Sequence, residues 1–377
     1  FEDGDLADAV AGIADDVVYV SAAGNAAEGH YEAEFQSMSL VEPTAGTSHL
    51  VHNFSTSSSS DPSLNIQLAP NGYVVAFLQW NDRFGSSAND YDLKLVNDAE
   101  NELLADSSES QSGFQDPLEA LCYHNNSSTT KIVKLAVEKY SGLGRRLELF
   151  IFGRDMAKEY NVPRGSIFGH SGVEGVISVA AINADNENNV TYYSSNGPAR
   201  IDYPYRVDRL KPDIAAIDGV AVTGTGGFPS TFYGTSAAAP HVAAIAGLLL
   251  EADTNASPRA IKNALMDGAV DVEAYGFDLV AGAGRVDALA SLSFLDAILD
   301  TDGDGVGDNA DAFPNNSSET KDTDGDGVGN NADTDDDGDG VPDTEDDFPL
   351  DPTRPGETSG AEASVCPDPT ITPVNLN

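Results

Sequence analysis

The chain has 377 residues, 62 acidic and 19 basic side chains, and a formal net charge of −43. Such a charge argues against nucleic acid and anionic membranes as partners, and it repels itself unless salt or bound cations screen it. No apolar run of about eighteen residues occurs, so no membrane span is expected, and two distant cysteines, Cys122 and Cys366, make neither a disulfide framework nor a zinc site.

The first residues read as one α/β unit. Residues 1–16 place Leu6, Val10 and Ile13 on one face, which predicts an amphipathic helix. Residues 17–25 follow as a continuous apolar run that ends in small residues, which is typical of a buried parallel strand. The run ends at Asn25, at the carboxyl end of the strand, where open α/β sheets bind ligands.

Residues 30–168 have a different pattern of hydrophobic and polar residues. Short runs in which hydrophobic and polar residues alternate lie between Ser/Thr-rich turns. They predict an inserted antiparallel β-sandwich, and the sequence does not indicate its ligand. These runs are 73–80, 91–96, 132–137 and 147–152. Four acids lie near strand ends, and they are either calcium ligands or, the reading that we favour, solvated turn residues: Asp82, Asp90, Asp92 and Asp116.

From residue 169 the sequence again has the hydrophobic pattern of an α/β fold. Residues 176–182 predict another buried strand, and the apolar pieces 211–216 and 219–222 are shorter. Ser257 and Pro258 predict the N-cap and first turn of an amphipathic helix. A last apolar helix to about residue 299 closes this part.

The stretch 234–250 contains a serine after a glycine, then Pro240, then residues that are apolar on every side. We expect Pro240 in the first turn of a helix that is buried all round. Ser236 is then either an ordinary N-cap or a nucleophile near the positive end of the helix dipole.

The segment 300–351 is a threefold acidic repeat in which oxygen ligands recur at loop positions 1, 3, 5, 7, 9 and 12, with glycine at position 6. A solvated linker would not keep this register, so the repeats predict calcium (Ca²⁺) loops. The expected ligands are Asp300, Asp302, Asp304, the Val306 carbonyl, Asp308 and Asp311; Asp322, Asp324, Asp326, the Val328 carbonyl, Asn330 and Asp333; and Asp335, Asp337, Asp339, the Val341 carbonyl, Asp343 and Asp346.

Position 12 is Asp rather than Glu and no flanking helix pairs are evident, so these are not ordinary EF-hands. With Phe313-Pro314 and Phe348-Pro349, the repeats instead resemble thrombospondin type 3 repeats. That resemblance implies loops that fold around calcium in an extracellular setting. Residues 352–377 read as a linker.

Five phrases of the α/β part, taken in order, resemble the C-terminal half of a subtilisin-like serine protease. They are residues 17–25, 176–182, 194–198, 210–215 and the phrase Gly-Thr-Ser-Ala-Ala-Ala-Pro-His-Val at 234–242. The resemblance implies that Ser236 is the acylated nucleophile and Asn25 the oxyanion-hole amide. It also implies a substrate-binding role for Ser21, Ala22, Ala23, Gly24, Gly226 and Thr235.

The sequence departs from that family in its histidines. The family order is Asp, His, Ser, and the first two should precede Asn25, but the first histidine is His30. His241 matches a packing position inside the nucleophile helix. Either the triad Asp and His precede Phe1 in a chain truncated at its start, or the protein is a pseudoenzyme.

We therefore predict a secreted subtilisin-like endopeptidase that acts on proteins or peptides, with calcium as its cofactor. The expected fold is a parallel α/β sheet with helices on both faces, an inserted sandwich and a repeat tail. The expected parts are 1–29 with 169–299, then 30–168, 300–351 and 352–377. The alternative is a calcium-dependent extracellular binding or adhesion protein with an inactive protease fold.

Overall fold

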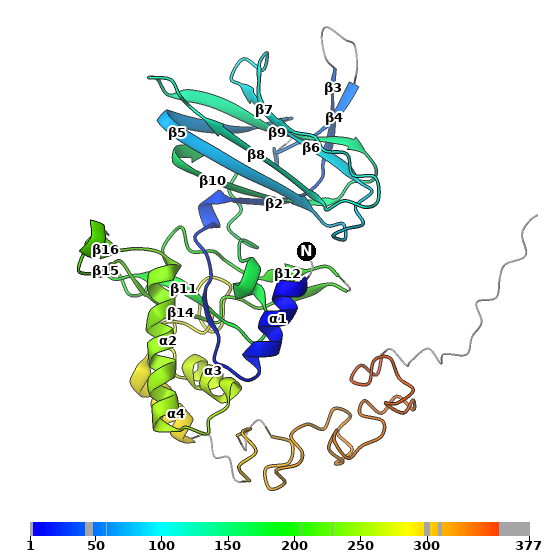
Figure 1. Cartoon of the computed structure of the whole chain (residues 1–377), viewed down its shortest axis with the longest axis vertical. Helices are drawn as coiled ribbons and strands as arrows, with labels where there is room; N and C mark the ends of the chain where they lie inside the picture. Colours follow the sequence, from blue (N-terminus) through cyan, green and yellow to red (C-terminus); the bar gives the residue numbers. More distant parts are fainter. Residues whose placement is uncertain are drawn as a thin grey trace, which may run out of the picture. The chain divides into compact units, whose positions relative to one another are not determined.

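The computed structural model describes residues 3–41, 48–57, 59–203, 205–227, 229–297, 302–307 and 311–353. The chain divides into two units, Phe1–Leu295 and Asp296–Asn377. Within the first unit, Figure 1 shows a body of antiparallel strands and a smaller parallel sheet with its helices.

The parallel sheet has three strands in the order β1 (Val20–Ala22), β11 (Ile177–Asn183) and β14 (Ile214–Asp218). Six of the seven residues of β11 are buried, as expected for the central strand of a covered parallel sheet. The register pairs Val20 with Ile177 and Val179 with Ile214. The carboxyl ends of β1 and β14 therefore lie at the same edge.

Four helices accompany this sheet: α1 (Asp5–Ala14), α2 (Thr235–Ala252), α3 (Pro258–Asp267) and α4 (Ala288–Ala297). The predicted cap of α3 is confirmed, because Ser257 Oγ accepts a 3.1 Å hydrogen bond from the Ala260 amide. In α1 the expected face is wrong in part. Val10 packs on Val173 and Val176, but Leu6 and Ile13 are exposed, since this helix lies at the surface.

The expectation that α2 is buried all round is wrong. The helix packs against β1, β11 and β14 through residues such as Ala238, Val242 and Ala246, while Leu248 is 60% exposed. A sheet covers only one face of a helix, and the exposed Leu248 shows that the remaining surface of α2 is not fully covered. By length and composition alone α2 could cross a membrane, but core helices pass the same test, so the absence of a span stays a prediction.

Residues between the two halves of this part form a nine-stranded antiparallel sheet. β5 is long and bends near Asn71, whose φ is +60°, so one half pairs with β9 and the other with β8, while β10 follows both halves. The strands are β2 (His30–Glu34), β3 (Ser37–Val41), β4 (Ser48–His52), β5 (Leu64–Trp80), β6 (Asp90–Asn97), β7 (Leu103–Ser107), β8 (Leu118–His124), β9 (Lys131–Ser141) and β10 (Arg146–Lys158).

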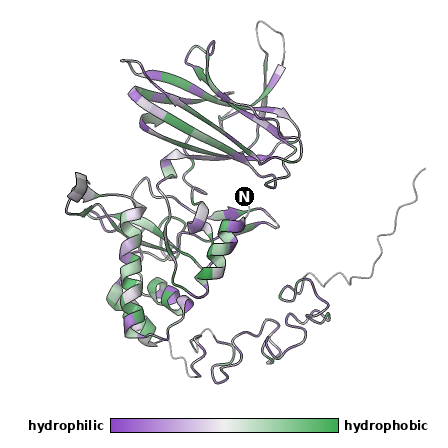
Figure 2. Cartoon of the chain, in the orientation of Figure 1, coloured by the Kyte–Doolittle hydropathy of each residue, from purple (hydrophilic) through white to green (hydrophobic). Residues whose placement is uncertain are grey.

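The alternation read from the sequence sets the inner face of this sheet. In β5, Val74, Ala76, Leu78 and Trp80 are fully buried and the residues between them are not. Figure 2 shows hydrophobic and hydrophilic residues mixed along the strands of this sheet. The buried side chains of β5 meet those of β6, β9 and β10 in one core. The hydrophobic pattern therefore fixes the register, because a shift of one residue would expose the whole set.

The four acids near the strand ends have protein partners. Asp82 is buried, pairs with Arg145 at 2.6 Å and accepts hydrogen bonds from Asn89, while Asp116 accepts one from the Gly85 amide. Among the described residues, no acidic cluster of metal-binding geometry lies in this sheet. Asp82, Asp90 and Asp92 are buried, so the prediction of solvated turn residues is wrong for these three, and only Asp116 is exposed.

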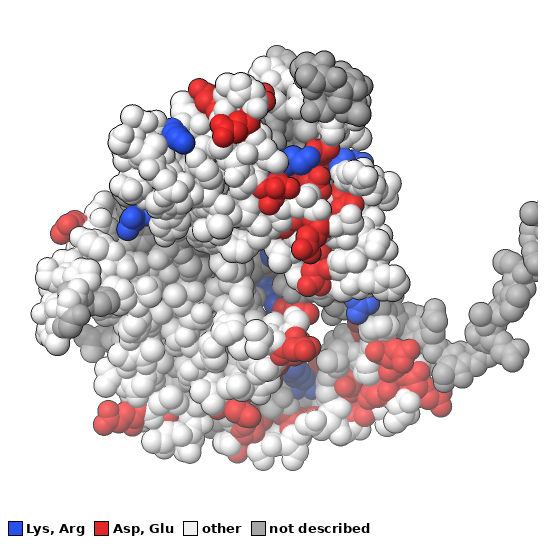
Figure 3. All heavy atoms as spheres, turned by 45° about the horizontal axis from the view of Figure 1, so that its top comes forward, with Lys and Arg blue, Asp and Glu red and all other residues white. Residues whose placement is uncertain are grey.

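Short elements connect the larger ones: η1 (Ala27–Gly29), η2 (Gly169–Gly172), β12 (Ala199–Ile201), β13 (Val207–Arg209), β15 (Val220–Ala221), η3 (Thr225–Gly227) and β16 (Thr231–Phe232). In the second unit, the described residues 302–307 and 311–353 form turns and bends without helix or strand. Figure 3 shows how acidic side chains outnumber basic ones on the face in view.

His52 makes the stability of the nine-stranded sheet depend on pH. Its Nδ1 accepts a hydrogen bond from the Gln36 amide, Nε2 lies 2.8 Å from the Tyr31 hydroxyl, and burial lowers its pKa from 6.5 to about 4. The unfolded chain therefore binds this proton first. The contribution is complete above pH 6.5 and is lost as the pH falls toward 4, a loss of about 3 kcal/mol in the free energy of unfolding.

Urea unfolding at a series of pH values tests this expectation. The variant His52→Gln should lack that part of the pH dependence, whereas the exposed His124→Gln should keep it. Equal pH dependence in His52→Gln and the unchanged protein would contradict the assignment.

Candidate active site

Gly234, the N-cap of α2, begins the turn that carries the candidate nucleophile. Its φ of +111° lies in the region that favours glycine, and no side chain caps the helix. Ser236 is the second residue of α2 and is exposed, so the interpretation of this serine as an N-cap is wrong. Pro240 lies inside the helix rather than in its first turn, because α2 begins at Thr235. The Ser236 hydroxyl remains at the positive end of the helix dipole.

Asn25 lies just beyond β1, and Thr235 holds its side chain. The Asn25 Oδ1 atom accepts hydrogen bonds from the amide and the hydroxyl of Thr235, both at 3.0 Å, and Thr235 Oγ1 accepts one from the Gly24 amide at 3.1 Å. With Oδ1 occupied in this way, the Asn25 Nδ2 group is left as a donor. Thr235, expected to bind substrate, is only 1% exposed and instead orients Asn25.

The free donor and the hydroxyl meet at Gly234. A Cβ atom at this position would lie 2.9 Å from Asn25 Nδ2 and 3.2 Å from Ser236 Oγ. The two groups thus flank one small space that only a glycine leaves open. A substrate oxygen there could accept a hydrogen bond from the amide while the hydroxyl attacks the adjacent carbon.

The other expected substrate-binding positions divide into two groups. Ser21 and Ala22 line a cavity of about 540 Å³ together with residues of α2. Ala23 is 1% exposed, and a Cβ at Gly24 would lie 2.9 Å from Ser195 Oγ, so these two pack against the interior instead. Gly226 lies in η3, between β15 and β16.

A third group at the site is one that the sequence analysis did not single out. The Asp218 carboxylate is 1% exposed, and its Oδ2 accepts a 2.9 Å hydrogen bond from the Gly234 amide and a hydrogen bond from the Tyr193 hydroxyl. Asp218 lies between the apolar pieces 211–216 and 219–222 of the sequence, at the end of β14. Its position at the carboxyl end of a parallel strand was the available signal.

All six histidines have hydrogen-bond partners other than Ser236. His241 Nδ1 bonds to the Ala237 carbonyl of its own helix at 2.8 Å, consistent with the packing role that the resemblance implies. The others bond to different parts of the chain: His30 to Val162, His49 to Glu138, His52 to Tyr31, His124 to Asn126 and His170 to Tyr19. Among the described residues, therefore, none is placed as a general base for Ser236.

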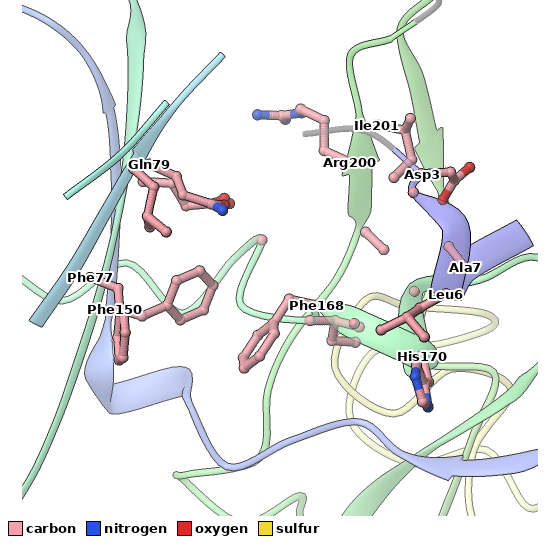
Figure 4. A pocket seen from close by; sticks show the side chains of 18 of the residues that line it. Asp3, Leu6, Ala7, Phe77, Gln79, Phe150, Phe168, His170, Arg200 and Ile201 are labelled. Carbon is pink, nitrogen blue, oxygen red and sulfur yellow. The ribbon is translucent and has the colours of Figure 1, made fainter. Parts of the chain in front are cut away.

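An apolar cavity lies apart from these residues. It measures about 780 Å³, and its apolar walls include Phe77, Phe150, Phe152 and Phe168. In Figure 4 the rings of Phe150 and Phe168 lie next to each other, and their T-shaped contact has a centroid distance of 4.6 Å. A cavity of about 530 Å³ does reach Asn25, and Tyr192, Tyr193 and Lys158 also line it. The candidate active site is therefore identified by its hydrogen-bonding groups and not by the volume of the cavity beside it.

Each acidic repeat brings three of its expected ligands together. Three groups place carboxylate oxygens within 4.8 Å of one another: Asp302, Asp304 and Asp311; Asp322, Asp324 and Asp326; and Asp335, Asp337 and Asp339. The position-6 glycines share one conformation, with φ of +93° at Gly305, +93° at Gly327 and +95° at Gly340. The loops therefore repeat in structure as well as in sequence. Asp300 and Asp308 lie outside the described residues.

The later loop positions make different contacts. The side chains of Asn330 and Asp343 accept hydrogen bonds from the amides of Thr323 and Asp336. The amides of Val306, Val328 and Val341 donate to the Asp two residues earlier, as in Asx turns. Neither Asp333 nor Asp346 joins a group within that distance, although Asp346 is 9% exposed.

Several buried carboxylate oxygens of the repeats have no hydrogen-bond donor: Asp302, Asp304, Asp311, Asp335, Asp336, Asp337, Asp339 and Asp346. Burial and the neighbouring carboxylates raise the pKa of Asp337. Converging oxygens without donors are what a hard cation such as calcium requires. The donor set of these loops therefore fits calcium.

Comparisons with known proteins match the part of the chain that contains Ser236. Residues 152–284, which include Ser236 but not Asn25, match the family model Peptidase_S8, the subtilase family. Subtilisin-like protease SBT4.12 of Arabidopsis thaliana is 36% identical over 121 residues, which are 28% of this chain and 16% of that protein. SBT1.9 of the same plant is 38% identical over 108 residues, 25% of this chain and 14% of that protein.

The CspB protease of Clostridium perfringens has a similar fold, with a TM-score of 0.50 over 78% of this chain and 64% of that chain. At 19% identity, that likeness concerns the fold alone. The resemblance of the acidic repeats to thrombospondin type 3 repeats stays a prediction. The family model and the two plant relatives are thus subtilisin-like proteases, and this chain spans about a sixth of the length of those relatives.

Proposed function

We propose that the full-length protein is a serine endopeptidase that hydrolyses peptide bonds through Ser236. The observation that carries this proposal is the meeting of Asn25 Nδ2 and Ser236 Oγ at Gly234, with Asn25 Oδ1 occupied by Thr235. An asparagine with only a structural role has no need to keep its Nδ2 donor beside an exposed serine hydroxyl. The substrates are proteins or peptides.

In this mechanism the Ser236 hydroxyl attacks the carbonyl carbon of the scissile bond. Asn25 Nδ2 donates to the oxygen as it becomes negative, and the N-terminus of α2 stabilises the same charge. Thr235 keeps Asn25 oriented through its two hydrogen bonds. The mechanism requires a base for the Ser236 proton, which none of the six described histidines supplies.

The second part of the proposal is that the acidic repeats bind calcium and fold around it. Its support is the convergence of carboxylate oxygens in three groups, together with buried oxygens that lack donors in the first and third loops. Loops of this kind in extracellular modules bind calcium at millimolar to submillimolar levels, so we propose an extracellular location. Calcium would also offset the self-repulsion of the segment.

One observation favours the alternative of a calcium-dependent binding or adhesion protein with an inactive protease fold. Each described histidine is bonded elsewhere, as shown by the 2.8 Å contact of His241 with Ala237. A fluorophosphonate probe, applied to the full-length protein, separates the two functions. Labelling of Ser236 supports the peptidase, and an unlabelled protein supports the alternative.

Replacement of Asn25 tests the oxyanion role. In Asn25→Asp, Oδ1 still accepts from Thr235 but the donor is gone, so we expect kcat to fall by about 10²–10³-fold, the range known for the oxyanion asparagine of subtilisin. KM should change little, because the donor acts on the transition state. Peptide hydrolysis by the full-length protein measures both constants. Unchanged kcat in Asn25→Asp would refute the assignment.

A further inference from the structure

Asp218 is a buried carboxylate that the proposed mechanism does not use. It is 1% exposed, and among the described residues no Lys, Arg or His is recorded as an ion-pair partner within 4.0 Å. Its Oδ2 instead accepts from the Gly234 amide at 2.9 Å and from the Tyr193 hydroxyl. A buried charge without a cation is costly, so these donors and the nearby N-terminus of α2 must stabilise it.

Asp218 is hydrogen-bonded to the backbone of Gly234, which lies between the Ser236 hydroxyl and the Asn25 donor. Gly234 has no side chain to pack, and its φ of +111° is one of many that glycine can adopt. Its amide therefore depends on a hydrogen bond for its position. A displacement of Gly234 would move Ser236, two residues later, relative to Asn25 Nδ2.

Tyr193 connects the same carboxylate to the other half of the site. Burial and the hydrogen bond to Asp218 raise the pKa of Tyr193 to about 12, so the hydroxyl keeps its proton and donates it. The Tyr193 carbonyl accepts a 3.2 Å hydrogen bond from the Ala27 amide, two residues after Asn25. Asp218 and Tyr193 thus link the segment of Asn25 with the turn of Ser236.

We propose that Asp218, with Tyr193, is a positioning residue that fixes the distance between the Ser236 hydroxyl and the Asn25 donor. This inference deepens the proposed peptidase function and rests on it for its effect on rate. Asp218 touches no substrate and acts only through Gly234. A misplacement of about 1 Å at a reacting group can cost about 10²-fold in rate.

Three variants of the full-length protein test this role. Asp218→Ala removes the acceptor, and we expect kcat and the rate of fluorophosphonate labelling to fall by about 10²-fold with KM little changed. Asp218→Asn keeps an oxygen acceptor for Gly234 and should restore most of the rate, because the role is positional rather than electrostatic. Tyr193→Phe should fall between the two.

Asp213 supplies the matched control. It precedes the same strand, is 4% exposed, and bonds to Lys211, Lys262 and the Ser178 amide at the opposite end of β14. Asp213→Ala should lower thermal stability without changing the labelling rate of the folded protein. Equal labelling rates in Asp218→Ala and Asp213→Ala would overturn the positioning role.

Amide hydrogen exchange at Gly234 tests the contact independently of activity. We expect Asp218→Ala to speed this exchange by about tenfold or more, and Asp218→Asn to leave it near the unchanged protein. If Gly234 depends on Asp218 but no probe labels Ser236, the contact stands and the peptidase function fails. If Gly234 exchange is the same in all variants, the positioning role fails whatever the activity.

Discussion

Replacing Ser236 by alanine is expected to abolish the peptidase activity of the full-length protein and its labelling by a fluorophosphonate. The Ser236 hydroxyl is the proposed attacking group, and the neighbouring Thr235 hydroxyl is already bonded to Asn25 Oδ1. The loss of kcat should reach about 10⁶-fold, the size known for the catalytic serine of subtilisin. Hydrolysis of a peptide library and mass spectrometry of the labelled peptide measure it.

The fold should survive this change, because Ser236 is exposed and alanine favours the helix. The melting temperature of Ser236→Ala should therefore stay near that of the unchanged protein. Ser293→Ala, an exposed serine in α4, serves as the matched control and should keep full activity. Activity retained by Ser236→Ala, or label attached to another residue, would refute the nucleophile assignment.

Removal of calcium is expected to unfold the acidic repeats. The described residues of this segment form no helix or strand and bury few apolar side chains, so cation binding must supply most of their stability. Chelation should change the circular dichroism spectrum and open residues 302–353 to proteases. The first unit should keep its protection, since its core does not contain these carboxylates.

A pair of charge-matched variants locates the binding sites. Asp337→Asn removes a carboxylate from the third cluster and should abolish or weaken one calcium site in a calorimetric titration. Asp347→Asn removes the same charge outside the clusters and should bind calcium as before. An unchanged spectrum and digestion pattern after chelation would sink the calcium proposal.

Local pattern was sufficient where one element decides its own structure. The alternation at residues 73–80 predicts the strand of β5, and the apolar run at 176–182 predicts the buried strand β11. The cap at Ser257 was equally legible, because its hydrogen bond closes within three residues. In each case the interaction that determines the structure lies inside the stretch that was read.

The hydrophobic pattern gave a wrong prediction where the burial of a helix depends on the elements that pack against it. The run 241–250 predicts a helix buried all round, but Leu248 is exposed, since burial depends on what covers each face. In α1 the same limit left Leu6 and Ile13 in solvent. The hydrophobic pattern reports which side chains favour burial, not how much surface the fold provides for them.

The sequence by itself determined the chemistry that is available: a serine after Gly-Thr, an asparagine at a strand end, and a thrice-repeated register of acidic oxygens. Only the tertiary structure decided what these groups face. Thr235 and Asn25 are 210 residues apart along the chain, and their hydrogen bonds exist because β1 and α2 meet. The sequence did not single out Asp218 for the same reason, because its partner Gly234 is adjacent in space and not in sequence.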